Sequence, residues 1–205
     1  MKKITSIILL LSILLTVLTL GLCSCDSKED KDRKSKKEKE SEKTTISTNL
    51  TRTQWEDAFS EEQFENFTYK EVAVVKMLGT ETNAETIYEF EKDKVKITAV
   101  VSGVTQSQVF SSDEADEIRE SFFDSLLPMV DFDDYTYDEK TQSYVLTGSC
   151  TIPSLGAEAT SAVIKFKNGK IVEMTYTCKA SQSGFEYEAS STVTFTKYGT
   201  TTVTD

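Results

Sequence analysis

The sequence predicts an α+β domain that is mostly β, with a curved antiparallel sheet similar to a half-barrel, an N-terminal helix, and one helix packed on the concave face. Three observations support this prediction. From residue 68 onward, runs rich in Val, Ile, Thr, Tyr and Phe alternate with polar turns, which is the pattern of short strands. Helical signals occur in two places only. Asn168-Gly169, between two of the runs, is a strong signal for a β-hairpin.

The first helix is expected to begin near Thr53, because Thr53 and Glu56 have the spacing of a capping box. A similar signal starts at Ser60, so a broken or restarted helix is expected up to about residue 65. We interpret Trp55, the single tryptophan, as a core anchor of this helix, with a ligand platform as the alternative.

Four strands and a second helix follow. The strands are expected at about 68–77, 84–91, 94–102 and 104–110. The helix is expected to begin at Ser111, which forms another capping box with Glu114, and to end at Pro128. Its apolar residues recur at helical spacing and are expected to pack on the sheet: Ala115, Ile118, Phe122, Phe123, Leu126, Leu127 and Met129.

Further strands complete the expected sheet, at about 132–138, 143–152, 157–167, 170–179 and 184–196. Residues 153–156 form one connecting turn, and Asn168-Gly169 closes a two-residue hairpin. The chain is therefore expected to form an antiparallel meander that curls around the second helix.

The hairpin registers place two cysteines. A two-residue turn at 168–169 pairs Ala159 with Cys178, and a four-residue turn at 153–156 pairs Ala159 with Cys150. Thiols that flank one residue from alternate strands lie roughly 9–10 Å apart at Cα, whereas a disulfide needs less than about 7 Å. We favour two buried free thiols. The alternative is a disulfide between Cys150 and Cys178, because export permits oxidation and a bulge would change the register.

The amino terminus, residues 1–24, has the features of an export signal. A basic start precedes an uncharged apolar run over 4–22, and Ser24 stands directly before Cys25. This pattern resembles the lipobox of bacterial lipoproteins, which implies cleavage before Cys25 and diacylation of its thiol. Cys23 is the competing cysteine, but a leucine precedes it where the family has Gly, Ala or Ser. An uncleaved anchor or an ordinary secretory signal would also place the domain outside the cytoplasm.

Residues 25–52 are expected to be the lipidated N-terminus and a disordered charged tether, followed by a single domain over 53–205. The segment 26–43 has no aromatic or aliphatic residue, so it cannot bury enough apolar surface to offset the entropy of ordering. Two acyl chains anchor a protein stably. The sequence thus predicts a protein held on the extracytoplasmic face of the cell membrane by a diacylglyceryl group on Cys25.

Composition argues against several functions. The chain has 205 residues, no histidine and a net charge of -11, and residues 47–205 alone contain 13 basic and 27 acidic residues, a net of -14. The lack of histidine excludes Ser-His-Asp and Cys-His catalysis and His-ligated zinc. The negative charge argues against nucleic acid as a partner. No nucleophile elbow, P-loop or dinucleotide motif is present, so we expect no enzyme, no catalytic residue and no cofactor.

The densest acidic run is 131–139. Its alternating carboxylates suit Ca²⁺, but the glycine and the twelfth-position glutamate of an EF-hand loop are missing. Paired carboxylates also serve as general acid and base, yet a domain with 27 acidic residues contains such pairs by chance. We interpret the run as a solvated turn and strand edge and expect no metal site.

The layout of an N-terminal helix, a curved meander, an inserted helix and an ending from Val193 to Gly199 resembles that of the LolA-like and LppX/LprG-like lipoproteins. The resemblance implies a half-barrel whose concave face holds lipid acyl chains, and it carries over no site residue. The first hypothesis is therefore a lipid-anchored protein that binds a lipid or other hydrophobic ligand. The alternative is an acidic protein–protein interaction module of the cell envelope without a small-molecule ligand, and an enzyme ranks third.

Overall fold

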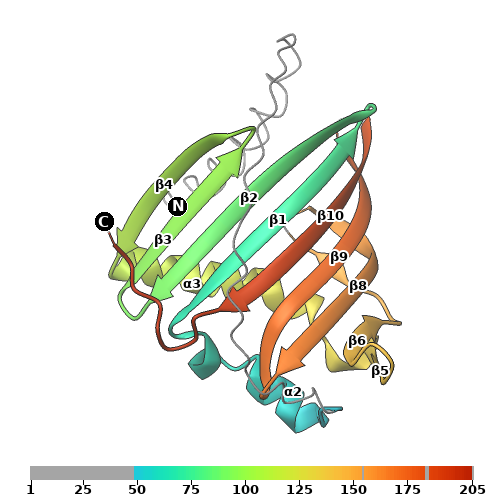
Figure 1. Ribbon diagram of the computed structural model, residues 1–205, viewed down its shortest axis with the longest axis horizontal. Coiled ribbons are helices and arrows are strands. Elements are labelled where there is room, and N and C mark those ends of the chain that lie inside the picture. Colours follow the sequence, from blue (N-terminus) through green and yellow to red (C-terminus); the bar gives the residue numbers. More distant parts are fainter. Residues whose placement is uncertain (1–48, 154, 183–184, 205) are drawn as a thin grey trace, which may run out of the picture. The chain divides into compact units, whose positions relative to one another are not determined.

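One antiparallel sheet organises the part of the chain that the structure, a computed structural model, describes: residues 49–153, 155–182 and 185–204 (Figure 1). Its strands are β1 (Phe67–Met77), β2 (Thr80–Glu91), β3 (Lys94–Val101), β4 (Val104–Ser111), β5 (Tyr135–Asp138), β6 (Ser143–Leu146), β7 (Thr151–Ile152), β8 (Ala157–Lys167), β9 (Lys170–Gln182) and β10 (Phe185–Thr196). They follow the order β4-β3-β2-β1-β10-β9-β8-β6-β5, and β7 pairs with β8 beside this path. Two meanders are thus joined where the first strand pairs with the last. The predicted fold class is confirmed.

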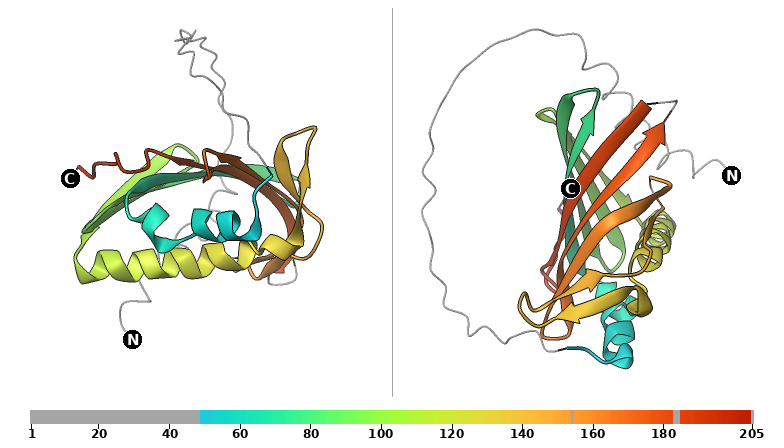
Figure 2. Two further views of the ribbon diagram at one scale, coloured as in Figure 1. Left: turned by 90° about the horizontal axis from the view of Figure 1, so that it is seen from below. Right: turned by 90° about the vertical axis from the view of Figure 1, so that its right-hand side faces the viewer.

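The helices lie on the concave side of the curved sheet, which was predicted for the second helix (Figure 2). The α-helices are α2 (Arg52–Ala58) and α3 (Asp113–Leu126), and the 3₁₀ helices are η1 (Glu61–Phe64), η2 (Leu127–Met129) and η3 (Phe132–Asp134). Helix α3 crosses the strands near one of their ends, and α2 lies beside it (Figures 1 and 2).

Helix α2 begins earlier than expected. The hydroxyl of Thr51 accepts the Gln54 N–H at 3.3 Å, and the Gln54 side chain accepts the Thr51 N–H at 2.9 Å. The prediction of a capping box at Thr53 is wrong, because this reciprocal pair forms upstream of it. The restart is confirmed, since Ser60 precedes η1. Trp55 is 2% exposed, which confirms it as a core anchor.

Helix α3 begins later than its sequence signal. Strand β4 continues through Ser111, and the chain turns at Ser112, which has a φ of 51° and makes no side-chain cap bond. The predicted capping box at Ser111 is therefore wrong. Leu127 is 49% exposed and does not extend the apolar stripe, because α3 ends at Leu126 and the tighter helix η2, which contains Pro128, begins at Leu127. The rest of the predicted stripe is buried or half-buried.

Two predicted strands are shorter than expected, and Asp134 is the reason. Its carbonyl accepts the N–H groups of Thr147 at 2.8 Å and Gly148 at 2.9 Å, which ends pairing after β6. The strand expected over 143–152 is therefore split into β6 and β7, and the strand expected over 132–138 is reduced to β5 behind η3. A Cβ on Gly148 would lie 2.9 Å from the Cα of Asp134, so glycine is needed at this turn.

The predicted register around the cysteines is confirmed. Ala159 pairs with Cys178 across β8 and β9, and the Ala159 N–H donates to the Cys150 carbonyl at 2.7 Å. Strands β8 and β9 contain two register shifts of opposite sense, so the pairing that the hairpin at Asn168-Gly169 sets is restored at Ala159. Both thiols are free and buried.

The C-terminal segment after β10 lies on the convex side, opposite the helices (Figure 2). The Asn66 side chain bonds the backbone of Thr201 at 2.9 and 2.7 Å, and the Thr201 and Thr68 hydroxyls are 3.0 Å apart. Farther on, the Val203 N–H donates to the Glu91 carboxylate at 3.0 Å. Thr201 and Val203 are buried, so this segment closes the convex face at one end of the strands.

Candidate functional site on the concave face

The predicted lipidation site, Cys25, lies outside the described residues, together with the signal 1–24 and most of the segment 25–52. Within the ranges that the structure covers, the chain has no helix with the length and apolar character of a membrane span. Leu50 is 7% exposed and Thr51 caps α2, so the packed domain includes residues before the expected start at 53.

The acidic run 131–139 forms η3, the edge strand β5 and the turn after it, and its carboxylates have local partners. Asp131 accepts the Asp133 N–H at 3.0 Å. Asp138 accepts the Lys140 N–H at 2.9 Å, and this bond lowers the pKa of the Asp138 carboxyl. Among the described residues, no three carboxyl or thiol groups gather as a metal-binding cluster.

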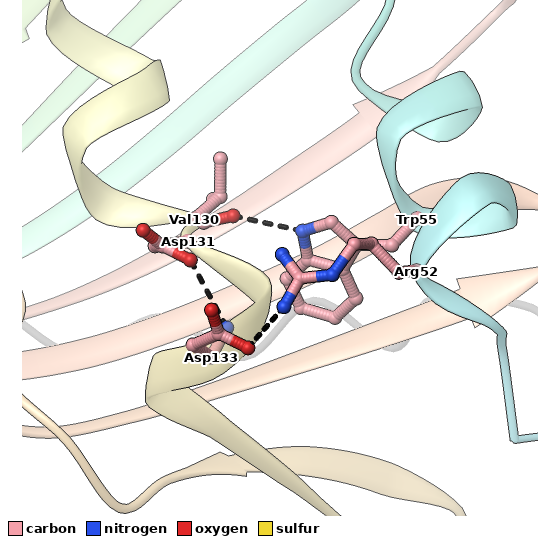
Figure 3. Close-up of polar contacts among 5 residues, drawn as sticks. All are labelled: Arg52, Trp55, Val130, Asp131 and Asp133. Atoms are coloured by element: carbon pink, nitrogen blue, oxygen red, sulfur yellow. Dashed lines mark hydrogen bonds and ion pairs between the residues drawn. The ribbon is translucent and has the colours of Figure 1, made fainter.

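This run also fastens α2 to the chain that follows α3 (Figure 3). Arg52 forms an ion pair with Asp133 and lies 5.0 Å from the centroid of the Phe132 ring. The indole N–H of Trp55 donates to the Val130 carbonyl at 2.8 Å. The side chains of the ion pair are 51% and 70% exposed, so the pair adds little stability. The region is a structural junction, and the buried indole is its main contact.

The two thiols are packing groups. Cys150 and Cys178 are 1% and 0% exposed, and burial raises the pKa of each thiol. A thiol that stays protonated and out of solvent is a poor nucleophile. The Tyr135 hydroxyl lies 3.9 Å from the Cys150 sulfur and donates to the Met129 carbonyl at 2.7 Å, which fixes this corner of the core.

At the end of the strands near the helices, aromatic rings fill the concave face. Phe67 and Phe90 stack with centroids 4.6 Å apart, and Phe64 packs edge-on against Phe67 at 5.0 Å and Phe123 at 5.3 Å. We call this region the covered half; its aromatic residues are Phe64, Phe67, Tyr69, Tyr88, Phe90, Phe122, Phe123, Phe195 and Tyr198.

Beyond α3, the same face has small side chains, and no described helix lies over it (Figures 1 and 2). We call this region the open half; its residues are Ala73 and Val75 of β1, Thr82, Ala84 and Thr86 of β2, Ala99 and Val101 of β3, and Ala189 and Ser191 of β10. Ala73 pairs with Ala84 on one side and Ser191 on the other. Ala73, Val75 and Ala99 are only half-buried.

Glu71 lies at the boundary between the two halves. Side chains alternate along a strand, so Glu71 shares the concave face with Tyr69 and Ala73. The Tyr69 hydroxyl donates to one carboxylate oxygen at 2.9 Å, and the Tyr176 hydroxyl donates to the other at 2.6 Å. Tyr176 comes from β9 and reaches across β10 to make this bond. Both oxygens of a half-buried carboxylate are thus held by neutral donors.

The tyrosines around Glu71 remain protonated over a wide pH range. Burial, and then the charge of Glu71, raise the pKa of Tyr69 and of Tyr176 well above the usual value. The same two causes raise the pKa of Tyr88 to about 12. The Tyr69 and Tyr176 hydroxyls therefore act as hydrogen-bond donors and hold the carboxylate in one orientation.

This arrangement places one oriented carboxylate on the concave face. By register, Glu71 is the single charged residue among the described concave positions of β1–β4 and β8–β10. One carboxylate provides neither a metal ligand set nor an acid–base pair. Sequence reasoning missed Glu71. The available signal was its place in the alternation from Phe67 through Tyr69 to Val75, where the other inward positions are aromatic or apolar.

Comparisons with known proteins identify no family. No family model matches the chain, and no curated protein matches it. Among solved structures, a DUF1329 family protein from Desulfovibrio piger is 8% identical and has a TM-score of 0.19. That match covers 73% of this chain and 92% of the other. A TM-score this low supports no conclusion about fold or function.

Proposed function

We propose that this protein is a lipid-anchored, extracytoplasmic lipoprotein whose domain binds a hydrophobic or amphipathic small molecule against the open half of the concave face. It acts by binding and not by catalysis. One observation carries the proposal: a tyrosine-held carboxylate, Glu71, borders a strip of small side chains that the described helices leave uncovered.

Physical chemistry supports a ligand in this position. Small-molecule sites are mostly apolar surfaces with a few well-placed polar groups, which is the composition of the open half with Glu71 at its inner end. On β1, β2 and β3, the aromatic side chains are confined to the covered half. A ligand on the open half would bury half-exposed apolar surface of Ala73, Val75 and Ala99.

Native mass spectrometry tests the proposal on the chain from Asp26 onward, purified without detergent. We expect a bound small molecule that dissociates on collisional activation. Ala73→Phe places a ring on the open half and removes the bound mass, whereas Val74→Phe, at the neighbouring position on the convex face, retains it. An empty wild-type domain, or a bound mass unaffected by Ala73→Phe, contradicts the proposal.

The anchor is tested separately in cells. We expect labelled fatty acid to be incorporated into the wild-type chain and into Cys23→Ser. In Cys25→Ser, both the labelling and the cleavage of the signal should be abolished. Labelling that survives Cys25→Ser contradicts the assignment of the lipid to Cys25.

The exposed surface of α3 favours a second candidate, an acidic interaction module of the cell envelope. Its exposed carboxylates are Asp113, Glu114, Asp116, Glu117, Glu120 and Asp124. Arg119 does not neutralise this surface, because its guanidinium is directed to backbone carbonyls of other elements. This candidate predicts an empty open half and a salt-sensitive envelope partner. Charge reversal at Glu117 and Glu120 would weaken that partner, whereas Ala73→Phe would not.

A further inference from the structure

We infer that the ligand of the open half is a cationic amphiphile, whose protonated amine pairs with Glu71 and whose aliphatic tail lies along the small side chains beyond it. The inference rests on the proposed function and specifies the chemical class of its ligand. It follows from the charge of Glu71, from the absence of a cationic partner for Glu71 among the described residues, and from the small side chains next to it.

The hydrogen bonds of Glu71 leave its charge unbalanced. Its two partners, Tyr69 and Tyr176, are neutral donors, and an ionised carboxylate can accept about four hydrogen bonds. The lysines of β1 itself, Lys70 and Lys76, lie on the other face. Each forms an ion pair on the convex side with a glutamate of β2. Among the described residues, a negative charge thus stands on the concave face without a positive charge beside it.

A half-buried carboxylate of this kind distinguishes ligands by charge. Unit charges interact more strongly near apolar protein surface than in water, so a ligand cation at Glu71 gains energy and a ligand anion is repelled. The net charge of -14 over residues 47–205 adds to the repulsion of fatty acids and phosphates. Tyrosine rings and hydroxyls around a carboxylate also suit an ammonium group, which is attracted to aromatic faces. The site therefore favours an amine over a carboxylate or phosphate head group.

The surface beyond Glu71 can accommodate the aliphatic tail of an amphiphile. Met77 lies six residue steps from Glu71 along β1, which corresponds to about 20 Å of strand. The inward positions over this distance are Ala73, Val75 and Met77, with Ala84 and Thr82 opposite them on β2. These side chains are apolar or small, and none is charged, so one aliphatic chain can lie along them from the carboxylate toward the end of the strands.

Three probes with the same tail test the head-group preference: dodecylammonium, dodecanoate and dodecyl maltoside. Isothermal titration calorimetry measures their binding to the chain from Asp26 onward, below the micelle-forming concentration of each probe and at physiological salt. A cooperative thermal melt first establishes that each variant is folded. We expect one dodecylammonium per chain, bound about tenfold or more tighter than dodecanoate, a preference that corresponds to about 1.4 kcal/mol.

Two variants that each remove one negative charge test whether Glu71 is the source of the preference for dodecylammonium. Glu71→Gln should reduce the difference between dodecylammonium and dodecanoate to less than about threefold. Glu89→Gln removes an equal charge from the convex face of β2 and should leave the preference intact. Ala73→Phe should weaken all three probes, because it occupies the path of the tail.

The outcomes separate this inference from the proposed function. If the three probes bind equally well and all are sensitive to Ala73→Phe, the open half binds amphiphiles but the inference about the amine is wrong. An amine preference that persists in Glu71→Gln also overturns the inference, because the surface charge would then be its source. If no probe binds the folded wild-type chain, the proposed function fails with it.

Discussion

The two halves of the concave face lie on the same strands and obey the same alternation, yet their contents differ. In the covered half, the inward residues of β1 and β2 are Phe67, Tyr69, Tyr88 and Phe90, and helix α3 adds Phe122 over them. In the open half, beyond Glu71, the next inward residues on the two strands are alanine, valine and threonine. The covered half therefore contributes aromatic packing to the fold, while the open half is the surface on which we propose that a ligand binds.

Arg119 of α3 connects the covered half to neighbouring segments of the chain. Its guanidinium donates to the carbonyls of Phe64 and Glu65, both at 2.9 Å, and to those of Glu91 at 3.0 Å and Lys92 at 3.3 Å. It also lies 5.3 Å from the centroid of the Phe90 ring. One side chain thus ties α3 to η1 and to the β2–β3 turn. Among the described contacts, the open half has no comparable tie to a helix.

The largest expected effect is the loss of an aromatic ring from the covered half. Phe64 is 0% exposed and contacts five aromatic rings, so Phe64→Ala should lower the free energy of unfolding by about 3–5 kcal/mol. Val75→Ala in the open half should cost about 1 kcal/mol or less, because Val75 is only half-buried. Urea denaturation measures both values. If Phe64→Ala does not fold, Phe64→Leu gives the same ranking, and equal costs at the two sites would break the comparison.

The Arg119 contacts predict a second, smaller effect. Hydrogen bonds to a charged group contribute about 1.5–3 kcal/mol, so Arg119→Met should destabilise the domain by roughly 2–3 kcal/mol. Arg119→Lys should recover little of the loss, because one ammonium cannot reach carbonyls of two separate segments. The control is Arg52→Met, whose exposed ion pair with Asp133 should cost less than about 1 kcal/mol. Similar losses for Arg119→Met and Arg52→Met would show that Arg119 does not fasten the covered half.

Alkaline pH tests the covered half without a substitution. Because the pKa of Tyr88 is raised from 10.0 to about 12, the unfolded chain loses this proton before the folded chain does. Stability should thus be at its full value below pH 10 and fall between pH 10 and about 12, by roughly 2 kcal/mol for this group. Urea denaturation across this range measures the loss. Tyr88→Phe should make the loss smaller by that amount, and an unchanged loss would contradict the assignment.

Local sequence signals predicted the elements of this fold well where one residue pair decides the geometry. Asn168-Gly169 fixed a hairpin, and Pro128 ended α3. The predictions of capping boxes at Thr53 and Ser111 were wrong. The residue pattern of a capping box does not determine where the preceding strand ends or where the helix begins. The register at Cys178 was correct although two shifts in β8 and β9 were not foreseen, since their effects cancel.

The candidate site was beyond local signals. Glu71 and Tyr176 are 105 residues apart, and they meet only because β1 pairs with β10, and β10 with β9. The pairing of the first strand with the last depends on how two meanders close on each other, which a pattern of alternating residues does not determine. The alternation itself placed Glu71 on the face of Tyr69, but its polar partners required the topology.

The smallest expected effect concerns space in the open half. Ala73 is half-buried, and no described helix covers it, so Ala73→Leu should change the free energy of unfolding by less than about 0.5 kcal/mol. Ala115, at 0% exposure on the inner side of α3, is the matched control, and Ala115→Leu should cost about 1–3 kcal/mol through overpacking. Thermal and urea denaturation compare the two variants. A cost at Ala73 as large as that at Ala115 would mean that the open half is already filled, and a ligand would then have no surface on which to lie.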